Sequence, residues 1–134
     1  MDSAMETLAS FAPQLRSVLR IMAGLLILQH GTTKLLGFPQ SPMSGASLTE
    51  LSGIAGVFEL VFGVLVTVGL FARFSAFILS GLAAAAYFIA HAPQGFYPLL
   101  NGGELAALYC FAFLYLAAAG PGPWSADAAR GKST

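Results

Sequence analysis

Four long runs of apolar residues dominate this sequence. They cover about residues 15–37, 51–71, 74–92 and 100–119, and shorter stretches rich in Pro, Gly and polar residues separate them. A helix needs about 20 apolar residues to cross the hydrocarbon core of a bilayer, so runs of this length predict membrane-spanning helices. The runs are continuously apolar and do not alternate with polar residues, which argues against a transmembrane β-barrel.

The composition supports the same interpretation. Of the 134 residues, 57% are hydrophobic and only 9% are charged, whereas soluble domains are about 25% charged. Six Lys and Arg balance six Asp and Glu, which argues against a nucleic-acid-binding protein. The single cysteine excludes an internal disulfide framework and a CxxC redox centre. We therefore predict an all-α integral membrane protein that forms a four-helix transmembrane bundle.

Polar segments flank this transmembrane domain of residues 15–119. Residues 1–14 are expected to form a polar tail or a short interfacial helix. A secretory signal is the competing interpretation for the first run, but His30 and Lys34 stand where such a signal needs small residues before a cleavage site. At the other end, the run Gly120-Pro-Gly-Pro123 ends the fourth helix. Residues 120–134 are then expected to be a cytoplasmic C-terminal tail.

The basic residues predict the orientation, because cytoplasmic loops are enriched in Lys and Arg. Both termini should be cytoplasmic in a bacterial inner (plasma) membrane, and the loops at 37–50 and 93–103 should face outward. Lys34 alone lies near the outer side of this four-span model. The other basic residues fall on the cytoplasmic side: Arg16, Arg20, Arg73, Arg130 and Lys132.

Glu59 is the residue that a membrane helix is least expected to contain. It lies eight residues into the second run, about 12 Å below the outer interface. A carboxylate at that depth costs at least about 2.5 kcal/mol, so it must be paired, hydrogen-bonded or protonated. It shares a helical stripe with Gly56, Gly63 and Thr67, which is typical of a packing seam. A structural clamp between helices and a functional group are both open interpretations.

Several further polar residues are predicted at similar depth in the outer half of the bundle. We predict Glu59, His30 and Lys34 as catalytic residues, and Gln29, His91, Asn101 and Glu104 as cofactor-binding residues, all converging in one outer pocket. A second polar group, Arg20, Arg73 and Asp127, is expected at the inner side, where Asp127 could pair with an arginine. The aromatic residues that could line the outer pocket are Phe58, Phe62, Phe88, Phe111 and Tyr115.

The outer pocket suits the chemistry of a quinone. His30 and Glu59 could move protons to and from a quinone carbonyl, and Lys34 could stabilise developing negative charge. A metal is the weaker hypothesis, because no HxxxH or ExxH pair lies on one helix. Haem is disfavoured as well, because there is no CxxCH and no pair of histidines facing each other across the bundle.

Three blocks of residues follow one another along the chain: Arg20, Gly24, His30-Gly31 and Lys34-Leu-Leu-Gly37; Glu59, Gly63, Gly69-Leu70 and Arg73; and Asn101-Gly-Gly-Glu104 followed by Gly120 to Asp127. In this order, on four apolar runs, they resemble the motifs of the DoxX family. The resemblance implies a four-helix bacterial inner-membrane protein. The family is named for a small subunit of a thiosulfate:quinone oxidoreductase, but a family label is weak support for a particular chemistry.

Three functions are compatible with the sequence. The first is a small membrane subunit of an oxidoreductase that engages quinone or quinol through the outer pocket. The second is a non-enzymatic anchor or assembly subunit for a redox complex, and the third is a pathway for a small molecule or proton. The expected partners are the lipid bilayer and either a redox-enzyme subunit or further copies of this chain. An anchor has no need of His30, Glu59 and Glu104 inside it, which favours a site.

Overall fold

The computed structural model describes residues 2–132, and every regular element in that range is helical. The all-α fold is therefore confirmed. The elements in chain order are α1 (Ser3–Ser10), α2 (Ala12–Leu36), α3 (Leu51–Val68), α4 (Ala72–Ala86), the π-helix η1 (Tyr87–His91), the 3-10 helix η2 (Ala92–Gln94), α5 (Pro98–Asn101), α6 (Glu104–Ala119) and α7 (Ala126–Ala129).

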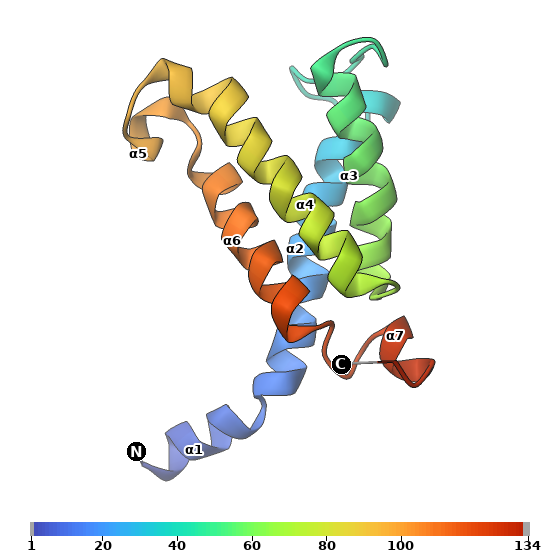
Figure 1. Cartoon of the computed structure of the whole chain (residues 1–134), viewed down its shortest axis with the longest axis vertical. Helices are drawn as coiled ribbons and strands as arrows, with labels where there is room; N and C mark the ends of the chain where they lie inside the picture. Colours follow the sequence, from blue (N-terminus) through green and yellow to red (C-terminus); the bar gives the residue numbers. More distant parts are fainter. Residues whose placement is uncertain (1, 133–134) are drawn as a thin grey trace.

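Four apolar helices build the fold as two antiparallel hairpins. Helix α2 packs along α3, and α4 packs along α6, with α3 against α4 as the main contact between the hairpins. Figure 1 shows that the hairpins lie together at the end that holds the α3–α4 turn and diverge toward the opposite end. We call the first the turn end (residues 69–71 and 120–132) and the second the loop end (residues 37–50 and 92–103).

Local sequence explains where the helices stop. Gly37 ends α2 and Gly69 ends α3, and both adopt the left-handed conformation that glycine tolerates best. The tight turn after Gly69 reverses the chain into α4 within three residues. Helix α4 runs on into the π-helix η1, and Pro93 in η2 precedes the loop to α5. These stops place both long loops at the same end of the molecule.

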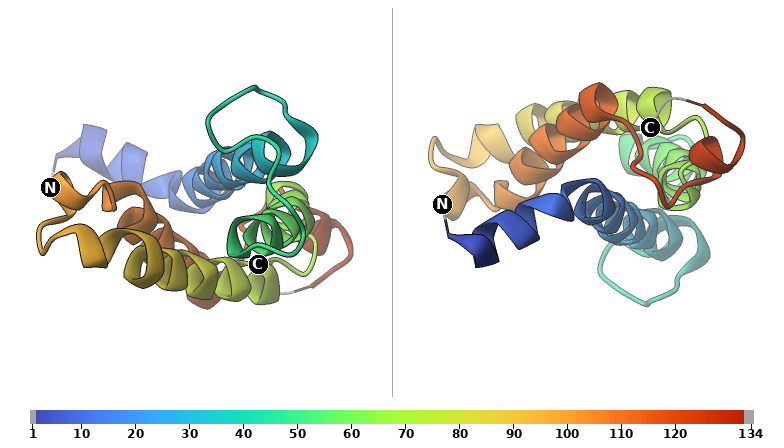
Figure 2. Two further views of the ribbon diagram at one scale, coloured as in Figure 1. Left: turned by 90° about the horizontal axis from the view of Figure 1, so that it is seen from above. Right: turned by 90° about the horizontal axis from the view of Figure 1, so that it is seen from below.

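The helices are compatible with a bilayer in length and composition. Helix α3 and the continuous segment Ala72–Gln94 are each long and apolar enough to cross a membrane, and α1 with α2 forms a third candidate bent by 57°. Helix α6 is apolar but has only 16 residues, which is about 24 Å of helix. The short α1 projects away from the bundle at that bend (Figures 1 and 2).

The apolar core lies between the two ends of the bundle and is shared by all four long helices. Val66, Leu79 and Phe113 are fully buried in it. Along the helices, these residues fall between the polar groups of the loop end and those of the turn end. The other core members are Ala23, Ile27, Ala76, Ala83, Tyr109 and Leu116.

The C-terminal segment differs from the tail predicted at residues 120–134. Its described part folds back against the turn end, where Pro121, Gly122 and Asp127 are buried. The backbone N–H of Asp127 donates to the carbonyl of Gly69, which ties the segment to the α3–α4 turn. Residues 133–134 of the predicted tail lie outside the described residues.

Candidate functional site

Glycines bring α2 and α3 close enough for their polar side chains to meet. A Cβ atom added at Gly31 would lie 2.8 Å from the backbone nitrogen of Leu60 and 2.9 Å from the carbonyl oxygen of Gly56. Only a residue without a side chain allows this approach of two backbones. The seam holds Lys34 of α2 and Glu59 of α3 at the same level.

Lys34 and Glu59 form a buried ion pair. The Lys34 Nζ atom donates to both carboxylate oxygens of Glu59, at 2.9 Å to Oε1 and 3.3 Å to Oε2. Only 9% of Lys34 and 6% of Glu59 are exposed. The carboxylate thus has the partner that its position requires, and each charge compensates the burial of the other. The pair joins the helices of the first hairpin.

His30 lies one helical turn before Lys34 and lines a pocket at the loop end. The pocket has a volume of about 220 Å³. The ring nitrogens of His30 make no hydrogen bond within residues 2–132, and its half-buried ring meets the edge of Tyr109 with centroids 6.0 Å apart. We call this the His30 pocket. Its lining residues are Gln29, His30, Thr33, Pro39, Ser41 and Met43.

A hydroxyl network holds the loop that forms one wall of the His30 pocket. The Thr33 hydroxyl contacts the Ser41 hydroxyl at 2.6 Å and donates to the carbonyl of Pro39. The carbonyl of Lys34 accepts from the backbone N–H groups of Gly45 and Ala46. The loop is therefore fastened to the last turn of α2, and the pocket wall is fixed relative to His30.

Tyr109 of α6 lies next to His30 and Glu59, and the three residues with Lys34 form one polar cluster. The sequence did not lead us to expect Tyr109 there. It is 6% exposed, and its ring stacks on Phe113 with centroids 5.7 Å apart. Its hydroxyl is buried and has no hydrogen-bond partner among the described residues, and it interacts electrostatically with Glu59. A tyrosine inside an apolar run could have indicated a polar site, because a buried phenol hydroxyl usually needs a hydrogen-bond partner.

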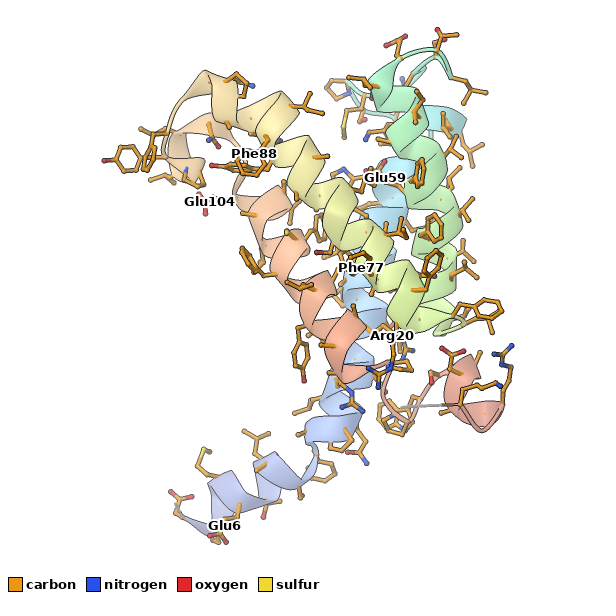
Figure 3. All side chains as sticks on the ribbon, viewed as in Figure 1. Glu6, Arg20, Glu59, Phe77, Phe88 and Glu104 are labelled. Atoms are coloured by element: carbon orange, nitrogen blue, oxygen red, sulfur yellow. The ribbon has the colours of Figure 1, made fainter. Side chains whose placement is uncertain are left out.

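The predicted convergence of all outer polar residues in one pocket is wrong. The Lys34–Glu59 pair and the His30 pocket belong to the first hairpin, whereas His91, Asn101 and Glu104 lie on the second. Figure 3 shows Glu59 and Glu104 on the two diverging hairpins. Equal depth in the membrane did not bring these side chains together, because the hairpins separate toward the loop end.

His91 and Asn101 form their own hydrogen-bonded group. The Nδ1 atom of His91 lies 3.1 Å from the carbonyl oxygen of Asn101. The Asn101 side chain donates to the carbonyl of Gly95 and to the Tyr87 hydroxyl, and accepts from the backbone N–H of Gly103. These bonds close the loop between η1 and α6, so both residues have a structural task.

Glu104 is exposed and borders a wide, shallow hollow of about 640 Å³ on the outside of α6. Its carboxylate makes no hydrogen bond or ion pair within the described chain. As the first residue of α6, it is stabilised by the positive end of the helix dipole. The other residues around the hollow are apolar: Pro98, Leu105, Ala107, Leu108 and Phe111.

At the turn end, Arg20 joins three parts of the chain. It is 1% exposed, and its guanidinium donates to the carbonyls of Val66 and Thr67 at the end of α3. It also donates to the carbonyls of Pro121 and Trp124 in the C-terminal segment. Figure 3 shows Arg20 at this junction. The Thr67 carbonyl in the last turn of α3 gains a partner in this way, and the Val66 carbonyl gains a second one beside the backbone N–H of Gly69.

Asp127 does not form the predicted pair with Arg20 or Arg73. Its two carboxylate oxygens accept from the backbone N–H groups of Phe71 and Ala72, at 3.0 and 2.8 Å, and so cap the start of α4. Its ion-pair contact is with Arg130, at 3.8 Å. Arg73 instead donates to the carbonyls of Ala117 and Ala118 at the end of α6. Contacts with helix ends therefore organise these three residues, and the Asp127–Arg130 contact adds to them.

Together, the apolar helices and the ion pair sealed between them define a multi-pass helical membrane protein. The DoxX family model matches residues 15–92, more than half of the chain. The protein belongs to the DoxX family. The match covers α2, α3 and the segment up to η1 and thus contains Lys34, Glu59 and His30, whereas the resemblance in residues 101–127 lies outside it.

A relative is known from Haemophilus influenzae. This uncharacterized protein is 42% identical over 128 residues, which cover 92% of this chain and 96% of the relative. The likeness therefore extends beyond the segment that the family model matches. No solved structure matches the chain.

Proposed function

We propose that this protein is a small membrane subunit of a quinone-linked oxidoreductase and that it binds the headgroup of a quinone in the His30 pocket. The observation that carries the proposal is His30 itself. Its ring lines the pocket, and its two nitrogens have no partner within residues 2–132. Pockets that bind small molecules combine apolar walls with a few such polar groups.

The residues of the pocket fit a quinone headgroup. Pro39 and Met43 supply apolar wall, and Gln29 and His30 supply groups that donate and accept hydrogen bonds. A bound quinone would supply the redox chemistry. The contribution of the chain would be to orient the ring against His30, whose imidazole can hold or release a proton near neutral pH.

In this proposal, Lys34 and Glu59 support the pocket and do not contact the ligand. They lie beside His30 but do not line the pocket, and they bind each other. We propose that the pair fixes α2 against α3 beneath the pocket, with Glu59 as the nearest store for a proton that leaves His30. Gln29 remains a proposed contact, whereas His91, Asn101 and Glu104 lie on the other hairpin and are not assigned to the ligand.

The anchor function is the second candidate, and the Lys34–Glu59 pair favours it. A clamp between helices needs no ligand, and a mutually satisfied ion pair serves such a clamp. A proton or small-molecule pathway across the membrane has less support. The core residues Val66, Leu79 and Phe113 separate the polar groups of the loop end from those of the turn end.

Binding of decylubiquinone to the purified chain in lipid nanodiscs tests the proposal. Empty nanodiscs correct for partition of the probe into lipid. We expect saturable binding that weakens about tenfold in His30→Gln, the equivalent of one hydrogen bond of about 1.4 kcal/mol. Gln94→Ala is the control, because this exposed side chain donates to the carbonyl of Ala90 and does not line the His30 pocket. Binding that does not saturate, or that is equal in both variants, would favour the anchor function.

A further inference from the structure

The hydroxyl of Tyr109 is a buried polar group that the packing of the fold does not explain. The ring is well packed between Phe113 and His30, and a phenylalanine would fill the same space. The hydroxyl has no hydrogen-bond partner within residues 2–132, and a buried group left unpaired costs about 1–3 kcal/mol. Such a group in a native structure calls for an explanation, and a partner that becomes available when the neighbouring pocket is occupied supplies one.

The surroundings of Tyr109 limit what that use is. Three helices contribute to its environment: His30 from α2, Glu59 from α3, and Phe113 from α6. Lys34 already donates to both oxygens of Glu59. His30 is the one member of this cluster whose ring contacts Tyr109 and whose hydrogen-bonding atoms are unused within residues 2–132.

We propose that Tyr109 is a positioning residue for His30. When a ligand occupies the His30 pocket, a rotation of the His30 ring about its Cβ–Cγ bond lets the Tyr109 hydroxyl donate to one nitrogen of the imidazole. A neutral imidazole has one nitrogen that accepts and one that donates. The nitrogen bonded to Tyr109 is then the acceptor, and the other carries its hydrogen toward the pocket.

This arrangement determines the class of ligand atom that the pocket prefers. An imidazole that presents N–H binds an acceptor, such as the carbonyl oxygen of an oxidised quinone. The hydroxyl oxygen of the reduced quinol is a weaker acceptor, because its lone pair is delocalised into the ring, and its own O–H finds no acceptor on this nitrogen. The inference rests on the proposed function and extends it, because it assigns the pocket a preference for the oxidised form and names the residue that creates it.

Tyr109→Phe tests the inference, with Tyr115→Phe as the matched control. Tyr115 lies on the same helix but is 51% exposed. Decylubiquinone and its reduced form, decylubiquinol, serve as probes in nanodiscs, and the ratio of their dissociation constants is measured together with the melting temperature of the free protein. Wild type and Tyr115→Phe should bind the oxidised probe about tenfold more tightly than the reduced probe.

Tyr109→Phe should bind both probes equally and should melt at the same or a higher temperature, because an unpaired hydroxyl has been removed. A ratio unchanged by Tyr109→Phe, or a lower melting temperature, overturns the inference, since the hydroxyl then has no effect on His30 or has a structural partner. These outcomes leave the proposed function standing if wild type binds the probes. A wild-type protein that binds neither probe overturns both.

Discussion

The Nζ atom of Lys34 lies 2.9 Å from Oε1 of Glu59, and this contact joins α2 to α3 one turn beyond their close approach at Gly31. Removing either partner leaves a buried charge uncompensated, which costs about 3–5 kcal/mol. We expect Lys34→Met and Glu59→Gln each to lower the melting temperature in detergent strongly. The double variant should lose much less stability than the two single variants lose together, because no unpaired charge remains. Additive losses would show that the contact contributes no coupling energy.

The glycine seam leads to a second prediction. An added methyl at Gly31 would meet backbone atoms at 2.8 and 2.9 Å, which side-chain movement cannot relieve. Gly31→Ala should therefore cost at least about 1–3 kcal/mol of stability. Gly81→Ala is the matched control: a Cβ there meets no atom of residues 2–132 within 4 Å, so the substitution should be neutral or stabilise by about 0.5–1 kcal/mol. Equal melting temperatures for the two variants would contradict this account of the seam.

Arg20 should be irreplaceable by lysine. Its guanidinium reaches four carbonyls on α3 and the C-terminal segment, and a single ammonium cannot reproduce that fork of donors. Arg20→Lys is expected to cost about 2 kcal/mol and to expose the 120–132 segment to limited proteolysis. Arg16→Lys, one turn earlier and half-buried, should leave the cleavage pattern unchanged. If both variants are cleaved equally fast, Arg20 does not hold the 120–132 segment in place.

Asp127 should contribute to stability but not to ligand binding. Asn in its place keeps one acceptor oxygen and leaves either Phe71 or Ala72 with an unpaired N–H, so Asp127→Asn should cost about 1 kcal/mol. Asp2→Asn is the control, because Asp2 caps the exposed α1. Binding of decylubiquinone should be unaffected in both. If Asp127→Asn loses binding and keeps its stability, the turn end takes part in the site.

Much of this architecture follows from helical periodicity. The continuous apolar runs predict the helices, and α3 begins at the predicted residue 51. The contact between Glu59 and Lys34 could also be predicted from the sequence. Glu59 shares a stripe with glycines, small residues mark the closest approach of helices, and the buried carboxylate requires a partner.

The relation between the two hairpins was not predictable in the same way. Periodicity gives the face and the depth of a residue on its own helix, but not the angle at which hairpins separate. His91 and Glu104 therefore have a suitable depth and lie on the wrong hairpin. The same limit applies to the aromatic residues: Phe111 and Tyr115 are 69% and 51% exposed, whereas Tyr109 is buried. In a helix that is apolar all round, no pattern indicates which face is inside.

The orientation in the membrane is the last prediction. The basic residues at the turn end predict that this end is cytoplasmic, and the His30 pocket then opens near the outer surface. Single cysteines at Gln40 and Lys132, both exposed, test this in a Cys110→Ala background, because Cys110 is the chain's own thiol. A membrane-impermeant maleimide added to cells with a permeabilised outer barrier should label position 40 and spare position 132, while disrupted membranes should label both. Labelling of position 132 alone in the permeabilised cells would place the His30 pocket at the cytoplasmic surface. A redox partner would then have to dock from the cytoplasm.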